Sequence, residues 1–199
     1  MQSDFKFLYD WTTSYFPKWK KITATYNPKK VLEIGSFEGR SSLFWSACNT
    51  VESVTCIDTW EGSFEHTGID FNIIEDNFDF NTSSSTKIIK KKGTSLSRLS
   101  ELIHEKCKFD LIYIDGSHEA HDVISDAVMA YALLNNNGIM IFDDYLWINR
   151  YKYGPWTGPR PDKIISHPKL AIDAFVNIYE PYIKIIDIGY QLILEKTIE

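Results

Sequence analysis

The sequence lacks several features that would each define a class of protein. Its three cysteines, Cys48, Cys56 and Cys107, are isolated and show neither disulfide spacing nor a zinc-ligand pattern. The chain has no apolar run of membrane-spanning length, and its amino terminus has no signal core. The formal net charge of -6 gives no electrostatic support to nucleic-acid binding. These absences favour a cytoplasmic protein that binds neither nucleic acid nor membrane.

The residues that are present are sufficient for one domain. A chain of 199 residues can bury a sizeable core, and aromatic residues make up 15% of it. Residues 1–27 are predicted to form an N-terminal helical segment of two helices divided by Pro17, because apolar residues recur there at helical spacing. This segment would pack on the domain or on a second subunit, in a homo-oligomer.

From residue 30 the sequence alternates short apolar runs with helical patterns. Strands are predicted at residues 31–34, 54–57, 87–89, 109–114 and 139–142, and helices at residues 40–48, 95–105 and 120–134. Residues 65–80 are ambiguous, and the run Lys90-Lys91-Lys92 is interpreted as a solvated loop. Repeated alternation with short connections predicts an α/β fold in which helices cover both faces of a parallel sheet.

The end of the chain departs from this alternation. Residues 135–138, three asparagines and a glycine, are expected to stop helix 120–134 with a left-handed cap. Pro168 opens another helix, and strands 182–187 and 190–194 follow it, joined by Ile188-Gly189 as in a hairpin. The predicted fold is therefore a Rossmann-like, mostly parallel sheet of seven strands with one antiparallel strand from the C-terminal hairpin.

A glycine loop follows the first predicted strand. Its spacing, Gly35-x-x-x-Gly39, differs from the Gly-x-Gly-x-x-Gly of dinucleotide binders, which disfavours a nicotinamide-dependent dehydrogenase. Glu33, just before the loop, could accept a hydrogen bond from a cationic amine or organise the loop. Asp58 ends the next strand, at about the interval where an acidic residue reaches the ribose hydroxyls of a bound nucleotide.

Three carboxylates end two later strands. Asp115 follows strand 109–114, and Asp143 and Asp144 follow strand 139–142. Because the carboxyl ends of parallel strands meet at one edge of a sheet, these side chains could form an oxygen-rich site for Mg²⁺ or Ca²⁺. Alternatively, each Asp only caps the turn after its strand.

Four stretches carry a resemblance to a known family: VLEIGSFEGRSS, CIDTWEGSFEH, YIDGSHEAHDVISDA and GIMIFDDYLW. They lie within residues 31–147, and the C-terminal hairpin extends the similarity to nearly the whole chain. In these features the sequence resembles the class I S-adenosylmethionine-dependent methyltransferases. It is most similar to the sugar and small-molecule O-methyltransferases related to macrocin O-methyltransferase.

The resemblance implies a binding site for S-adenosylmethionine, with Glu33 at the methionine end and Asp58 on the ribose. The cofactor-binding residues that it implies are Glu33, Gly35, Ser36, Gly39, Asp58, Trp60, Thr94, Ser95 and Asp115. Trp60 would flank the adenine, although it could equally be a core residue. Thr94 and Ser95 would lie near the adenine, or they could simply cap a helix.

The resemblance also implies a reacting site. Asp115, Asp143 and Asp144 match the ligands of a divalent cation, expected to be Mg²⁺, in the metal-dependent members, where the cation lowers the pKa of a bound hydroxyl. Some relatives carry Asp-Gly-Asp where this chain has Asp115-Gly116-Ser117-His118. His118 is therefore the first candidate for the general base and His66 the second. Alternatively, His118 makes a structural hydrogen bond at the start of its helix.

Residues 146–167 form a long segment rich in aromatic residues, glycine and proline, which is interpreted as a substrate lid. Alternatively, its rings hold the segment against the core. Aromatic faces suit the apolar faces of sugars, which is the reason for the interpretation as a lid. The resemblance implies that the reaction is methyl transfer to a hydroxyl of a sugar or glycan. Two alternatives remain open: an O-methyltransferase for catechol-like phenols, and a noncatalytic S-adenosylmethionine-binding module.

Overall fold

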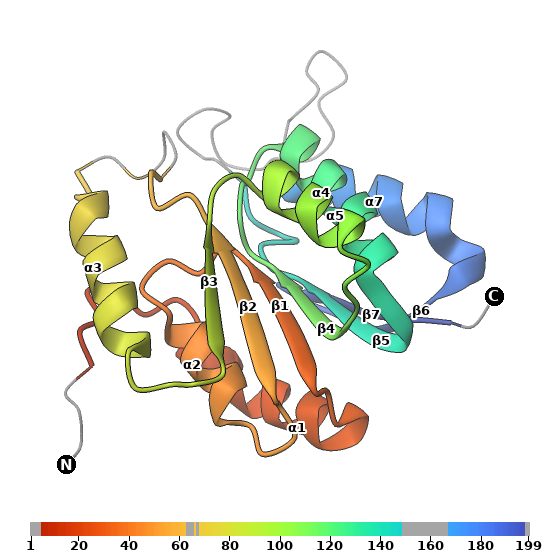
Figure 1. The fold of residues 1–199 in the computed structure, drawn as a ribbon. Coiled ribbons are helices and arrows are strands. Elements are labelled where there is room, and N and C mark those ends of the chain that lie inside the picture. Colours follow the sequence, from red (N-terminus) through yellow and green to blue (C-terminus); the bar gives the residue numbers. More distant parts are fainter. Residues whose placement is uncertain (1–4, 63–65, 67, 149–166, 198–199) are drawn as a thin grey trace.

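The computed structural model describes residues 5–62, 66, 68–148 and 167–197. Seven strands form one sheet in the order β3-β2-β1-β4-β5-β7-β6 (Figure 1). They are β1 (Lys30–Ile34), β2 (Ser53–Asp58), β3 (Ile88–Lys92), β4 (Phe109–Ile114), β5 (Leu134–Phe142), β6 (Ile183–Ile188) and β7 (Leu192–Lys196). Neighbours among β1 to β5 pair in parallel, whereas β7 runs antiparallel to both β5 and β6. The predicted Rossmann-like sheet with a C-terminal antiparallel strand is confirmed.

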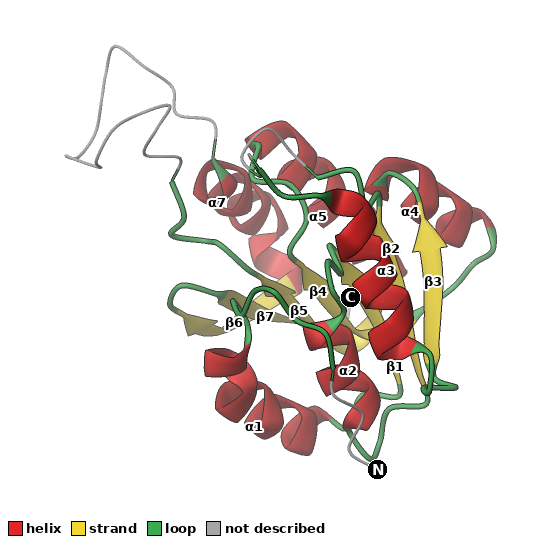
Figure 2. Ribbon diagram, turned by 90° about the vertical axis from the view of Figure 1, so that its left-hand side faces the viewer, coloured by secondary structure: helices red, strands yellow, loops and turns green. Residues whose placement is uncertain are grey.

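Helices cover both faces of the sheet. The described helices are η1 (Thr13–Tyr15), α1 (Phe16–Tyr26), α2 (Arg40–Ala47), α3 (Phe71–Thr82), α4 (Ser95–His104), α5 (Ala120–Leu133), α7 (Pro168–Tyr179) and η2 (Glu180–Tyr182). Helices α1, α2 and α3 lie on one face, and α4, α5 and α7 lie on the other (Figures 1 and 2). None of the helices in the described part of the chain combines the length and the apolar character that crossing a membrane requires.

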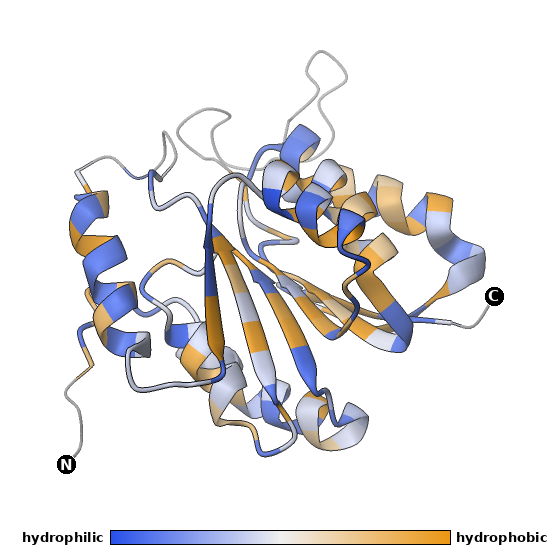
Figure 3. Cartoon of the chain, viewed as in Figure 1, coloured by the Kyte–Doolittle hydropathy of each residue, from blue (hydrophilic) through white to orange (hydrophobic). Residues whose placement is uncertain are grey.

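Strand periodicity divides the core into two layers. On β5, Ile139 and Ile141 belong to the cluster beneath α1, α2 and α3, while Met140 and Phe142 belong to the cluster beneath α4, α5 and α7. Successive side chains of a strand point to opposite faces, so a run that is apolar at every position needs a covered sheet. Hydrophobic residues accordingly recur along the central strands, whereas one half of edge strand β3 is hydrophilic (Figure 3).

Two boundary predictions near the ends of the chain are wrong. Residues 5–12 form no helix, and Pro17 is the second residue of α1 rather than a divider between two helices. The connection between β6 and β7 covers residues 189–191 instead of Ile188-Gly189, because β7 begins only at Leu192.

Two predictions in the middle of the chain also require correction. The lysines at 90–92 are part of edge strand β3 and pair with β2 from Cys56 to Asp58, so they do not form a solvated loop. Helix α5 ends at Leu133 with an extended C-cap at Leu134, so residues 135–138 do not cap it. A left-handed residue, Asn137 with φ 61°, lies instead within β5.

The strand order also determines where a ligand can bind. From β1 the chain builds outward through β2 and β3, and it then returns to place β4 and β5 on the other side of β1. In open α/β sheets, ligands bind outside the carboxyl ends of the strands where the order reverses. This point lies between the ends of β1 and β4, which carry the glycine loop and Asp115.

Candidate active site

The loop after β1 has a backbone that favours glycine. Gly35 has φ 86° and Gly39 has φ 80°, both in the left-handed region. A Cβ atom on Gly35 would lie 1.8 Å from the backbone oxygen of Asp115, and one on Gly39 would lie 3.0 Å from the Phe78 ring of α3. The loop is therefore closely packed between the end of β4 and helix α3.

A Gly35→Ala substitution should lower the free energy of unfolding by roughly 2–5 kcal/mol, because left-handed strain adds to the overlap with Asp115. Gly68→Ala is the matched control, since Gly68 has φ 85° and an added Cβ would meet no atom of the described residues within 4 Å. The control should lose only the ~1–2 kcal/mol of backbone strain. Urea denaturation followed by circular dichroism measures both, and equal losses would contradict a special need for glycine at position 35.

Asp58 organises the glycine loop. Its Oδ2 accepts hydrogen bonds from the backbone N–H groups of Ser36 and Phe37, each at 2.9 Å, and its Oδ1 accepts one from Trp60 at 2.7 Å. The Trp60 indole donates to the Phe37 carbonyl at 2.8 Å, and its ring is buried against Phe78. The structure thus places Trp60 in the core, and the ribose contact of Asp58 stays a prediction.

Glu33 lies at the end of β1 and is fully buried. Burial raises the pKa of its carboxyl, and the hydrogen bond that the Ser42 hydroxyl donates to its Oε2 opposes that rise. Its Oε1 has no hydrogen-bond partner among the described residues. A buried acceptor left without a partner costs about 1–3 kcal/mol, so a donor such as the cofactor's ammonium group would satisfy it. This orphaned oxygen fits the predicted role of Glu33 at the methionine end of the cofactor.

Residues 5–12, which we call the N-terminal strap, lie along the glycine loop. The Glu38 carboxylate accepts hydrogen bonds from the backbone N–H groups of Leu8 and Tyr9, at 2.9–3.1 Å. Arg40 donates to the Tyr9 carbonyl at 3.0 Å. Two side chains from the start of α2 and the loop before it therefore dock the strap through its backbone.

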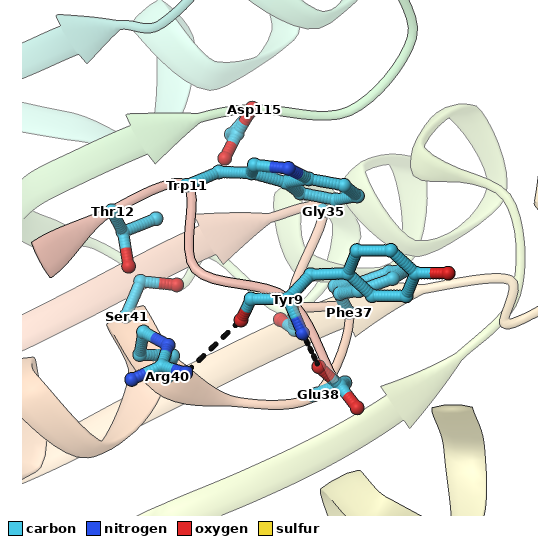
Figure 4. Close-up of a pocket in the computed structure, with 10 residues that line it drawn as sticks. Tyr9, Trp11, Thr12, Gly35, Phe37, Glu38, Arg40, Ser41 and Asp115 are labelled. Atoms are coloured by element: carbon cyan, nitrogen blue, oxygen red, sulfur yellow. Dashed lines mark hydrogen bonds between the residues drawn. The ribbon is translucent and has the colours of Figure 1, made fainter. Parts of the chain in front are cut away.

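A pocket of about 40 Å³ lies between the strap and the loop (Figure 4). Its lining residues are Tyr9, Trp11, Thr12, Gly35, Ser36, Phe37, Glu38, Arg40, Ser41 and Asp115. The Trp11 ring centroid lies 4.9 Å from that of Phe37 and 5.1 Å from that of Tyr9. The loop and Asp115 were predicted from the sequence, whereas the aromatic residues of the strap that line this pocket were not.

Three side chains converge beside this pocket. Asp115, His118 and Asp144 each offer one ligand atom within 4.8 Å of the other two, and we call them the triad. His118 Nε2 lies 2.8 Å from Asp144 Oδ2. Asp143 is more deeply buried, and the Tyr113 hydroxyl donates a hydrogen bond to it. The structure thus groups two of the three predicted metal ligands with the predicted base and places Asp143 in the interior.

The carboxylates of this cluster repel one another. Burial, followed by the charges of Asp143 and Asp144, raises the pKa of Asp115 well above its usual range. Burial and Asp144 also raise the pKa of Asp143, and burial together with all three carboxylates raises the pKa of Tyr15 to about 12. A divalent cation would offset this repulsion, and two carboxylates with an imidazole are suitable donors for one. The residues therefore fit a divalent cation.

The other predicted base and the predicted lid are only partly connected to the triad. His66 lies beside the strap, with its ring centroid 6.3 Å from that of Trp11, and it is not a member of the triad. Most of the predicted lid, residues 146–167, lies outside the described residues. Within its described part, the Trp147 ring centroid lies 4.2 Å from that of His118.

Thr94 and Ser95 lie at the start of α4. The Thr94 hydroxyl accepts a hydrogen bond from the Ser97 N–H at 3.3 Å, as an N-cap does. The Ser95 hydroxyl lies near Asp126 of α5 and lowers the pKa of that carboxyl. Both side chains therefore have structural partners, and their predicted contact with the adenine stays a prediction.

Asp126→Asn should make the protein more stable near pH 7. Burial raises the pKa of Asp126 to about 6, with the Ser95 hydroxyl only partly opposing it. The folded state thus binds this proton more tightly than the unfolded state, so stability falls as the pH rises from about 4 to about 6, by ~3 kcal/mol. Urea unfolding of both proteins at several pH values should show the advantage of the variant growing over that range. An advantage that does not change with pH would contradict this effect.

Comparison of the sequence with known proteins identifies the family of this chain. The family model described as a methyltransferase domain matches residues 32–145. O-methyltransferase hkm8 of Aspergillus hancockii is 26% identical over 164 residues, which cover 80% of this chain and 61% of hkm8. This chain spans less than two thirds of the length of the curated relatives that it matches.

Two solved structures illustrate the similarity in fold. The O-methyltransferase from Bacillus cereus in complex with SAH superposes with a TM-score of 0.66 at 16% identity, over 96% of this chain and 84% of that one. MycE, the methyltransferase of the mycinamycin biosynthetic pathway in complex with Mg and SAH, gives 0.65 at 15% identity, over 95% and 51%. Because the family match covers more than half of the sequence, the chain belongs to the methyltransferase domain family.

Proposed function

We propose that this chain transfers the methyl group of S-adenosylmethionine to a hydroxyl of a sugar or glycan, with the help of a divalent cation, Mg²⁺. The observation that carries the proposal is the position of Asp115, which lines the pocket beside the glycine loop and is also a member of the triad. A methyl donor bound in the pocket and an acceptor oxygen bound at the triad would thus both lie next to Asp115. MycE, which has a similar fold, is in complex with both Mg and SAH, and this supports a site that holds a cation beside the cofactor.

The cofactor supplies a methyl group already activated on a sulfonium, and the cation lowers the pKa of the acceptor hydroxyl. Asp115 and Asp144 would hold the cation, with Asp143 as the third predicted ligand. His118 would take up the hydroxyl proton, and the Asp144 carboxylate 2.8 Å away would stabilise the imidazolium that forms. The chain thus acts mainly by positioning the two reactants, which is a large effect in a bimolecular reaction.

We expect entry of the cofactor to shift the N-terminal strap. Pockets for ligands of this size measure roughly 300–1,000 Å³, whereas the pocket under the strap measures about 40 Å³. Trp11 is 55% exposed, so its displacement would uncover little buried apolar area. We therefore expect the strap to move outward around the Glu38 and Arg40 contacts when the cofactor binds.

Calorimetry with S-adenosylhomocysteine (SAH), the demethylated product, tests the cofactor assignment, and NAD is the control. SAH should bind and NAD should not. A panel of glycosides and catechols, assayed for methyl transfer with Mg²⁺ or with excess EDTA, then tests the acceptor and the cation. Transfer to catechols alone would replace the sugar assignment with the phenol alternative. SAH binding with no transfer to any acceptor would favour a noncatalytic binding module.

A further inference from the structure

Gln191 links the two ends of the chain to the carboxylate cluster. It lies in the connection between β6 and β7 and is fully buried. Its Oε1 accepts a hydrogen bond from the Trp19 indole N–H of α1 at 3.0 Å. Its Nε2 donates to Asp143 Oδ2, also at 3.0 Å. Both ends of the side-chain amide are therefore engaged inside the core.

The indole determines which way this amide faces. An indole N–H can only donate, so it must face the amide oxygen, and the amide NH₂ must then face Asp143. Trp19 has little freedom of its own, because it is fully buried, with ring centroids 4.5 Å from Trp45 and 5.1 Å from Tyr113. The buried Trp19 indole of α1 thus holds the Gln191 amide in one orientation. In that orientation the amide NH₂ donates to the Asp143 carboxylate, which follows β5.

The contacts of Asp143 orient the residue that follows it. Asp143 Oδ2 accepts from the Tyr113 hydroxyl as well as from Gln191, and its Oδ1 accepts from the backbone N–H of Asp144 at 2.8 Å. Asp144 has φ 55°, a left-handed conformation that is uncommon for residues other than glycine. Fixing the Asp143 carboxylate therefore fixes the backbone from which Asp144 reaches His118.

We propose that Gln191, oriented by the Trp19 indole, is a positioning residue for the cation that Asp115 and Asp144 would hold. It would act through Asp143, whose orientation determines where Asp144 lies. This inference rests on the cation-assisted function proposed above. Residues that orient metal ligands usually change metal affinity 10–100-fold when they are replaced. The proposal adds α1 and the C-terminal hairpin to the parts of the chain on which cation binding depends.

The test is Mn²⁺ binding to the full chain, measured by electron paramagnetic resonance, with SAH affinity measured in parallel. Gln191→Met keeps the length of the side chain and removes both hydrogen bonds, and it should weaken Mn²⁺ binding roughly 10–100-fold. Trp19→Phe should weaken it in the same direction. The double variant should be no weaker than Gln191→Met, because both substitutions interrupt one pathway. SAH affinity should stay within about two-fold of the parent protein in each case.

Trp45→Phe is the matched control. Trp45 is a fully buried tryptophan in contact with Trp19, but its Nε1 has no hydrogen-bond partner among the described residues. The Trp45→Phe variant should lose packing stability as Trp19→Phe does, which thermal unfolding will show. It should nevertheless keep the Mn²⁺ affinity of the parent protein.

Three outcomes would overturn the proposal and leave the cation-assisted function intact. The first is Mn²⁺ binding in Gln191→Met that stays within two-fold of the parent. The second is an equal loss in Trp45→Phe and Trp19→Phe, which would reduce the effect to packing. The third is a double variant whose loss is the product of the two single losses. Wild-type protein that binds no Mn²⁺ would remove the cation-assisted function and this role with it.

Discussion

Asp144→Asn should lower kcat/KM for methyl transfer by roughly 10³-fold, because the loss of a cation ligand removes several kcal/mol of transition-state stabilisation. Asn is the right replacement, since Asp144 has φ 55° and Asn tolerates the left-handed region better than Ala does. The substitution therefore removes the charge with little change to the backbone. Initial rates at saturating S-adenosylmethionine and Mg²⁺, with the acceptor found in the panel, measure the effect.

Asp173→Asn is the control for this charge removal. Asp173 of α7 accepts hydrogen bonds from Lys169 at 2.6 Å and from Tyr145 at 2.7 Å, and it is not a member of the triad. This variant should retain activity within a few-fold of the parent protein. Undiminished wild-type activity in excess EDTA, or Asp144→Asn activity close to that of the control, would rule out the cation-assisted mechanism.

The central strands could be predicted because their signal is local. Every residue of β5 from Ile139 to Phe142 is buried, and each is apolar, as a strand covered on both faces requires. The turn at Gly189 likewise indicates a hairpin, and this signal depends on only a few neighbouring residues. The order of the strands follows from the short connections and the handedness of crossovers, so the edge of the sheet that carries the site was also predictable.

The lysine run of β3 could not be predicted in this way, because its partners are distant in sequence. Lys90 Nζ lies 2.8 Å from a Glu75 carboxylate oxygen and 2.7 Å from one of Asp79, both on α3. It also lies 4.6 Å above the Trp60 ring. Helix α3 falls largely in the stretch that was ambiguous in the sequence. From the sequence alone, a run of lysines next to a glycine therefore resembles a loop. The carboxylates of α3 that neutralise the charge of Lys90 become apparent only in the structure.

The strap shows the same limit at the candidate site. Its docking joins Leu8 to Glu38, 30 positions away, and Lys6 to Asn81, 75 positions away. Periodicity reports only neighbours within a helix or strand, so it assigned the apolar residues of the strap to a helix. The consecutive carboxylates illustrate a further limit. Their separation into an interior Asp143 and an outer Asp144 depends on the left-handed backbone at Asp144, which no local pattern specified.

His118→Ala should lower kcat by roughly 10²–10⁴-fold, the usual loss for a general base. Asp144 is hydrogen-bonded to the His118 ring at 2.8 Å and would stabilise its protonated form, so the pair can accept a proton and hold it. The KM for S-adenosylmethionine should change little, because His118 is not among the residues that line the pocket proposed for the cofactor. Single-turnover rates measured at saturating cofactor and Mg²⁺ report the chemical step without product release.

His121→Ala is the matched control, since His121 lies on α5 three positions further on and its side chain is 77% exposed. It should stay within about two-fold of the parent in rate. Mn²⁺ affinity then separates the two roles that the geometry allows His118. A base is needed only for proton transfer, so its loss leaves cation binding unchanged, whereas a ligand lost from the triad weakens Mn²⁺ binding together with the rate. A His118→Ala variant that keeps both the single-turnover rate and the Mn²⁺ affinity of the parent would exclude both roles and move the base to His66.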